Sequence, residues 1–270
     1  MNHQIVGIHG APRSGTSWLG QLFNSHEQVA YRFQPFFSHA FRGRLTTHSG
    51  PDDMYRFFGD LLETHDAFVT QSGDARLAHE MPSFAKAPAT HLAYKEVRFH
   101  DLMEPILATL PQARLIGIVR DPLQVLQSWV GAPREFRHDW SILSEWKAAP
   151  GKNAGLQENW YGFDRWKALA RLFLDLEKRY PERFMIVRYG DLVRNTFDWM
   201  ERLFSFAGLS SSPQTTQFIR DSTSRDDGDP YGVHRAGQPA ARMRLPGEVR
   251  AAIVQDLAGS DLARFTADSR

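Results

Sequence analysis

Short apolar runs alternate with longer amphipathic segments along this chain of 270 residues. The runs are rich in strand-forming residues, whereas the segments between them repeat apolar residues at helical spacing. The runs predict buried strands at residues 5–8, 29–31, 92–97, 115–119 and 184–187. The amphipathic segments predict helices that begin near Trp18 and Pro122 and helices that cover residues 52–64, 101–110, 159–179, 196–207 and 246–262.

Strands that alternate with helices predict an α/β fold with a mostly parallel sheet of four or five strands and helices on both faces. The length fits a single three-layer domain over residues 1–270. Three segments lack the clear hydrophobic period of a helix or a strand. Residues 70–89 predict a loop that could close over a substrate, residues 131–155 give no secure assignment, and residues 210–245 are polar and irregular.

The first strand runs into a glycine-containing loop and then into a helix. Glycines at Gly10 and Gly15 allow a tight turn. The backbone amides of residues 14–17 can then converge on an anion at the helix N-terminus, where the helix dipole also favours negative charge. This arrangement predicts a phosphate-binding loop.

The residues of the loop argue against a nucleoside triphosphate with bound magnesium. Gly10 and Gly15 have the spacing of a Walker loop and Ser17 stands at the magnesium-binding hydroxyl, but Thr16 occupies the position of the lysine. Arg13 is the one cation inside the loop, and its planar fork suits a single phosphate. The loop therefore predicts a metal-free site for a monophosphate-like group.

Residues 12–19, Pro-Arg-Ser-Gly-Thr-Ser-Trp-Leu, resemble the 5'-phosphosulfate loop of sulfotransferases that use 3'-phosphoadenosine 5'-phosphosulfate (PAPS). The resemblance implies a P-loop-like turn in which Arg13 is the cation beside the leaving phosphate. It implies that the nucleotide is bound by Arg13, Ser14, Gly15, Thr16, Ser17 and Trp18.

Two further segments resemble the same family, in the expected order. Arg120 ends a predicted strand and Ser128 follows eight residues later, as in the family's pair that holds the 3'-phosphate of PAPS. Residues 186–192 resemble the family's strand that ends in Tyr-Glu-Asp-Leu, which implies that Tyr189 approaches the adenine. A tyrosine of the core is an equal alternative for Tyr189.

The family's usual catalytic bases are absent from their expected positions. Glu96 is our first candidate for the base, with Lys95 orienting the substrate or assisting the leaving group, because both end a predicted strand. His39 and His100 are further candidates, and a structural ion pair is the alternative for Glu96. The family's basic closing loop lacks its lysine in this chain, and Arg235 is the arginine that we expect to replace it.

The acceptor is expected to be a hydroxyl or amine compound. Residues 32–44 interleave aromatic and basic side chains, which suits a sugar, a phenol or an anionic glycan, with a carbohydrate favoured. A loop packed on the core by its phenylalanines is the alternative. The chemistry implied by the resemblance is in-line sulfuryl transfer from PAPS without a metal. The protein could also form a homo-oligomer.

The composition of the chain argues against several other functions. The formal net charge of +1 gives no overall attraction to nucleic acid or to a membrane. The absence of cysteine excludes disulfides, zinc-thiolate sites and thiol nucleophiles. Since no apolar stretch has the length of a membrane span, we expect a soluble protein in the cytoplasm, where PAPS is made. The remaining alternatives are a P-loop kinase or nucleotidase and a non-catalytic binder of adenosine 3',5'-bisphosphate (PAP).

Overall fold

The computed structural model describes residues 3–72, 81–224, 232–233 and 244–266. Its centre is a parallel sheet of five strands in the order β2-β3-β1-β4-β5. The strands are β1 (Gln4–His9), β2 (Val29–Phe33), β3 (His91–Glu96), β4 (Ala113–Val119) and β5 (Phe184–Arg188). All five were predicted, because strands covered on both faces are apolar along nearly their whole length.

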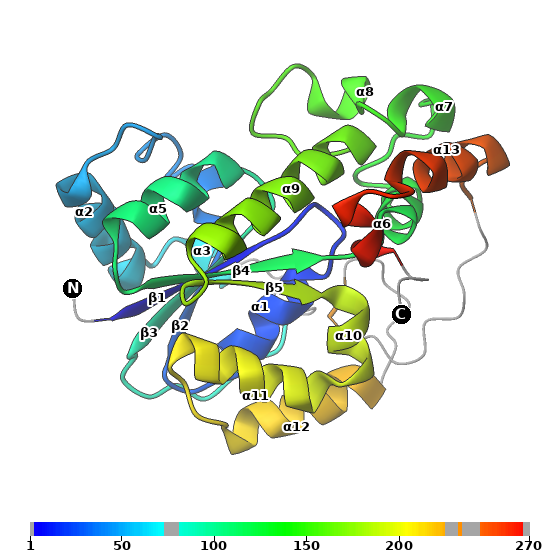
Figure 1. The fold of residues 1–270 in the computed structure, drawn as a ribbon. Helices are drawn as coiled ribbons and strands as arrows, with labels where there is room; N and C mark the ends of the chain where they lie inside the picture. Colours follow the sequence, from blue (N-terminus) through cyan, green and yellow to red (C-terminus); the bar gives the residue numbers. More distant parts are fainter. Residues whose placement is uncertain (1–2, 73–80, 225–231, 234–243, 267–270) are drawn as a thin grey trace.

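Helices cover both faces of the sheet, as Figure 1 shows. One face packs in a single apolar cluster with α1 (Thr16–Asn24), α10 (Tyr189–Arg194), α11 (Thr196–Ala207) and α12 (Pro213–Ser224). The other face packs with α2 (Pro51–Glu63), α5 (Met103–Thr109), α6 (Pro122–Val130), α9 (Phe163–Arg179) and α13 (Gly247–Leu257). The predicted three-layer α/β arrangement is therefore confirmed.

Short helices complete the part of the chain that the structure describes. They are α3 (Ala67–Thr70), α7 (Ile142–Glu145), α8 (Pro150–Asn153) and the 3-10 turns η1 (Pro35–Phe37), η2 (His100–Leu102) and η3 (Asp261–Phe265). Two of them, α7 and α8, lie in the segment that gave no assignment from sequence. No described helix is long and apolar enough to cross a membrane.

Two predicted boundaries are wrong, and one helix was not predicted. Helix α9 begins at Phe163 and not at residue 159, because Gly162 precedes it with a φ of 88°, outside helical geometry. Helix α12 lies inside the segment predicted to be irregular; its buried face includes Thr215 and Ser222, which weaken the apolar pattern. Helix α13 ends at Leu257, before the predicted 262.

Candidate functional site

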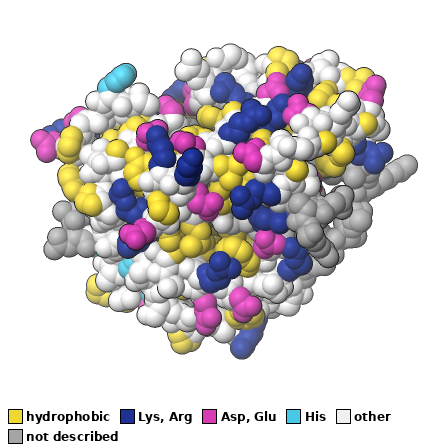
Figure 2. Space-filling view, in the orientation of Figure 1, with side chains coloured by type: hydrophobic (Ala, Val, Ile, Leu, Met, Phe, Trp, Pro, Cys, Tyr) yellow, Lys and Arg dark blue, Asp and Glu magenta, His cyan; other side chains and the backbone are white. Residues whose placement is uncertain are grey.

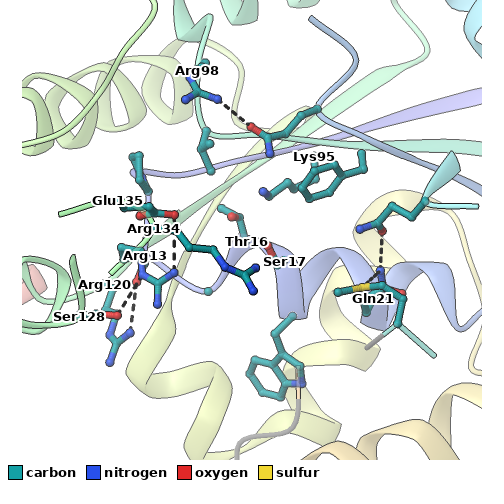
Figure 3. Close-up of a pocket in the computed structure, with 18 of the residues that line it drawn as sticks. Arg13, Thr16, Ser17, Gln21, Lys95, Arg98, Arg120, Ser128, Arg134 and Glu135 are labelled. Atoms are coloured by element: carbon teal, nitrogen blue, oxygen red, sulfur yellow. Dashed lines mark hydrogen bonds and ion pairs between the residues drawn. The ribbon is translucent and has the colours of Figure 1, made fainter. Parts of the chain in front are cut away.

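A cavity of about 260 Å³ opens where the parallel strands end. The loop after β1 forms one wall, and residues at or just beyond the ends of β2, β3 and β4 form the others (Figure 3). This is the edge at which open α/β sheets bind ligands. From the predicted loop at residues 70–89, Gln71 and Met81 reach this cavity, and both contact the amide of Gln21.

The loop between β1 and α1 presents the start of a helix to the cavity. Helix α1 begins at Thr16, has no side-chain cap, and has no acidic residue in its first turn. The first amides of a helix lack partners inside it and carry the positive end of the dipole. Thr16, Ser17 and Trp18 line the cavity at this end, so it offers backbone donors and positive potential to an anion.

The turn before α1 depends on two left-handed residues, Arg13 with φ 72° and Gly15 with φ 92°. A Cβ atom on Gly15 would lie 2.5 Å from Cδ2 of Tyr189, so only glycine fits against that ring. The Tyr189 ring also meets Trp18 edge to face and lies 4.5 Å from the guanidinium of Arg120. Tyr189 supports the loop from behind and is not among the residues that line the cavity.

Two arginines and a serine from distant parts of the sequence meet beside this turn. Arg13 Nε donates to Ser128 Oγ at 3.2 Å across 115 residues of sequence. Arg120 donates through a terminal nitrogen to the carbonyl of Arg13 at 3.2 Å, and all three side chains line the cavity (Figure 3). The residues of two predicted phosphate-binding motifs therefore share one cavity.

Lys95 lies in the cavity wall opposite the loop. Its side chain is almost wholly buried, and its ammonium lies 4.5 Å from the centre of the Phe33 ring. Burial lowers the pKa of Lys95 to about 8. Figure 3 shows Lys95 and Arg134 reaching toward Thr16 and Ser17, which concentrates positive charge at the start of α1.

Glu96 does not share the cavity with Lys95, because adjacent residues of a strand point to opposite faces. Its carboxylate is fully buried and accepts a hydrogen bond from the backbone N–H of Phe36 at 2.7 Å. Burial raises the pKa of Glu96 from 4.5 to about 8. The expectation that Glu96 would face the substrate is therefore corrected, and Lys95 alone of the pair does so.

The buried Glu96 gives the protein a specific dependence of stability on pH. Because its folded pKa is raised, the native state holds the proton more tightly than the unfolded state, and stability is lost as pH rises from 4.5 through about 8. We expect Glu96→Gln to reduce this loss. Urea unfolding at pH 5 and pH 8 measures it, with Glu158→Gln as the control that keeps the wild-type difference. An unchanged difference in Glu96→Gln would contradict the assignment.

Two other expected site residues, Ser14 and His39, do not line the cavity. Ser14 is buried beside Trp166 and Phe173, with its amide bonded to the carbonyl of Ala11, so neither its hydroxyl nor its amide faces the ligand. His39 is exposed and does not line the cavity. Arg235 lies outside the described residues.

His100 is fully buried and lies outside the cavity lining. Its Nδ1 lies 3.2 Å from Nδ1 of His9, and burial lowers the pKa of both rings, which keeps them neutral. The pair is part of the core between β1 and η2, so His100 is not placed to act on a substrate.

The aromatic and basic residues of the stretch 32–44 divide between the two predicted roles, which were an acceptor pocket and a loop packed on the core. Phe33 and Gln34 line the cavity, whereas Phe36 and Phe41 are buried in the core. The guanidinium of Arg32 donates to backbone carbonyls, among them that of Leu61 at 2.7 Å. Only the start of the stretch therefore reaches a ligand.

Several lining residues escaped the sequence analysis. Arg98 is fixed by Asn159 Oδ1 at 3.0 Å and lies over the ring of Phe37 at 4.0 Å. Arg134 and Glu135 come from the segment without a period, and Tyr161 from the turn before α9. No local pattern marks these positions, because tertiary packing alone brings them to the cavity.

The cavity carries a strong excess of positive charge. Its lining includes Arg13, Lys95, Arg98, Arg120 and Arg134, and among the described lining residues Glu135 is the one carboxylate. The molecule as a whole is nearly neutral, and Figure 2 shows Lys and Arg interspersed with Asp and Glu over the visible face. The attraction for anions is therefore local to the cavity.

Comparison with known proteins gives consistent results. A family model described as "Sulfotransferase family" matches residues 6–213, more than half of the chain. Carbohydrate sulfotransferase 1 of Danio rerio is 25% identical over 289 residues, which cover 85% of this chain and 68% of that protein. The chain spans between 57% and 70% of the length of the carbohydrate sulfotransferases of fish and mammals that it matches.

Solved structures of the same fold are more distant in sequence. A sulfotransferase from Alicyclobacillus acidocaldarius superposes with a TM-score of 0.52 at 16% identity, covering 96% of this chain and 93% of that one. A mouse sulfotransferase complexed with PAP superposes with a TM-score of 0.50 at 12% identity, covering 98% of this chain and 87% of that one. These likenesses support the fold described above.

Proposed function

The chain belongs to the sulfotransferase family, and on that premise we propose that it transfers a sulfuryl group from PAPS to a hydroxyl group and releases PAP. The convergence of Arg13, Arg120 and Ser128 at the uncapped start of α1 carries the proposal. Two guanidinium groups at the positive end of a helix together attract negative charge. A nucleotide with a phosphate at both its 3' and 5' positions supplies that charge, and a mouse sulfotransferase of the same fold is complexed with PAP.

The residues divide into two anion sites. We assign the 5'-phosphosulfate to Arg13 and to the amides at the start of α1, which stabilise charge on the leaving phosphate oxygen. We assign the 3'-phosphate to Arg120 and Ser128. The fork of Arg120 is oriented by Gln124, whose Oε1 accepts from its Nε at 3.2 Å. Gly15 lets the backbone approach the nucleotide as closely as this requires.

Sulfuryl transfer at this site depends on positioning of the reactants and on positive charge from the protein more than on a metal ion. The sulfuryl group carries one negative charge fewer than a phosphoryl group, so less charge has to be neutralised, and positioning with electrostatic stabilisation does most of the work in related transfers. Arg13 and Lys95 supply fixed positive charge next to Thr16, where a Walker loop has its lysine.

We propose a carbohydrate acceptor, and more narrowly an anionic one. The relatives named above are carbohydrate sulfotransferases. Phe33 and Tyr161 line the cavity and offer flat faces to a sugar ring. Arg98, which is held by Asn159 and Phe37, supplies a preorganised cation for a carboxylate or sulfate on that sugar.

Binding of PAP tests the nucleotide site. We expect Arg120→Ala to raise the Kd for PAP by about 10- to 100-fold, because a hydrogen bond to a charged group contributes about 1.5–3 kcal/mol. Arg114→Ala is the matched control: Arg114 lies near the start of β4 and donates to Gln4, whereas Arg120 directly follows the end of this strand. Calorimetry with PAP measures both. Equal affinity in the two variants would refute the assignment of Arg120.

Sulfate transfer tests the activity itself. The protein is incubated with PAPS, a chelator and a mixture of neutral sugars, uronic-acid sugars and phenols, and the products are analysed by mass spectrometry. We expect sulfated uronic-acid sugars to form in the presence of chelator. Binding of PAP without any transfer would identify a non-catalytic binder, and transfer that needs ATP and magnesium would identify a kinase.

A further inference from the structure

Glu135 is the one carboxylate among the described residues that line the cavity. Its Oε1 lies 3.8 Å from a terminal nitrogen of Arg13. Its Oε2 is buried without a hydrogen-bond partner. The backbone at this position is fixed, because its N–H donates to the carbonyl of Ala132 at 2.9 Å and its carbonyl accepts from Trp129 Nε1 at 3.3 Å. The structure thus holds, in the cavity wall beside Arg13, a carboxylate with one unsatisfied oxygen.

A carboxylate at this place opposes the binding of a phosphosulfate. Two negative charges repel each other, and inside a protein that repulsion is stronger than in water. Arg13, Lys95 and Lys152 all interact electrostatically with Glu135. The negative charge of Glu135 therefore weakens the attraction of these three cations for an anionic ligand. A cavity built only to bind anions would do so better without Glu135, which points to a role in the reaction.

We propose that Glu135 is the catalytic base. Its carboxylate pairs with Arg13 until the phosphosulfate binds to that guanidinium, and it is then released toward the acceptor. This proposal rests on the proposed sulfotransferase function. In the step, the acceptor oxygen forms a bond to sulfur while the bond from sulfur to the 5'-phosphate oxygen breaks. The acceptor proton moves to Glu135, and the electron pair of the broken bond stays on the phosphate, opposite Arg13.

The other ionisable groups around the cavity are less suited to accept that proton. Tyr161 faces Glu135, and burial raises its pKa, so the phenol keeps its proton. The guanidinium groups of Arg13, Arg98 and Arg134 are hydrogen-bond donors without an acceptor atom, so they do not suit this role. Lys95 carries a lowered pKa of about 8, so it is mainly charged at neutral pH. Glu96, with its carboxylate bonded to Phe36, does not reach the cavity.

The test uses the full chain with PAPS and the mixture of neutral sugars, uronic-acid sugars and phenols, and release of PAP is the readout. We expect Glu135→Gln to lower kcat by about 100-fold. We also expect its Kd for PAP to be equal to or lower than that of the wild type, because the amide no longer competes for Arg13. Glu135→Asp should recover part of the rate.

Glu158→Gln is the matched control, since Glu158 also pairs with an arginine, Arg42 at 3.1 Å, but lies outside the cavity. It should keep the wild-type rate. A kcat of Glu135→Gln within threefold of the wild type would overturn the proposal. A loss of PAP binding in step with kcat would also overturn it, because that is the result for a structural ion pair. If the wild type binds PAP but releases none from PAPS, the proposed function itself fails, and the assignment of Glu135 fails with it.

Discussion

Arg13→Ala is expected to lower kcat for sulfuryl transfer by about 1,000-fold, which is the upper range for the loss of one donor to a developing negative charge. The guanidinium lines the cavity beside Ser128 and the start of α1, to which we assign the leaving phosphate oxygen. Its main-chain carbonyl, which accepts from Arg120, is kept in the variant. The substitution therefore removes the cation while leaving the contact between the two loops.

Arg13→Lys separates the effect of the positive charge from the effect of the planar guanidinium group. A lysine keeps the positive charge but lacks the planar fork that also reaches Ser128, so we expect a rate between those of Arg13→Ala and the wild type. Arg42→Ala, which removes an exposed arginine paired with Glu158, is the control and should keep the wild-type rate. Turnover is measured with PAPS by release of PAP. A rate of Arg13→Ala within tenfold of the wild type would show that Arg13 does not stabilise the leaving group.

Gly15→Ala is expected to abolish measurable binding of PAP and to destabilise the fold. The left-handed conformation costs a residue with a Cβ about 1–2 kcal/mol. At Gly15 the new Cβ would also lie 2.5 Å from the Tyr189 ring, which is closer than atoms can approach. Either the turn or Tyr189 must move, and both support the start of α1. The amides that we assign to the phosphosulfate then lose their common direction.

Gly43→Ala provides the control for this prediction. Gly43 has a similar left-handed φ of 74°, but nothing lies within 4 Å of the position of its Cβ. Gly43→Ala should lower the free energy of unfolding only by the cost of the left-handed backbone conformation, and it should leave PAP binding unchanged. Urea unfolding and calorimetry with PAP are measured on both variants. If the two glycines give the same loss of stability and neither affects binding, the contact with Tyr189 is not what the loop requires.

The fold was predictable because its main features are local in sequence. Strands buried on both faces read as apolar runs, and helices packed on one side repeat at helical spacing. The longest exception was α12, whose buried face includes Thr215 and Ser222, so that an amphipathic helix had the composition of a loop. The start of α9 was misplaced because Gly162 interrupts an aromatic pattern that continues before it.

The site was predictable only where its residues are neighbours in sequence. The loop from Pro12 to Trp18 is contiguous, and Arg120 and Ser128 are linked through one helix, so both signatures could be read directly. Alternation along β3 separates Lys95 from Glu96, but no sequence pattern tells which of the two faces the cavity. Glu135 lies in a segment without a period, and its place beside Arg13 depends on how that segment packs.

The support that Tyr189 gives to Gly15 links the first turn of the chain to the last strand. Tyr189 follows β5 directly, and β5 pairs with β4 at the edge of the sheet that the described residues form. A polypeptide that ends before β5 would thus contain the whole glycine loop and still lack the ring against which that loop is shaped. Nucleotide affinity should appear late in folding, after the edge strand has docked, and bound PAP should slow the opening of that edge in hydrogen exchange.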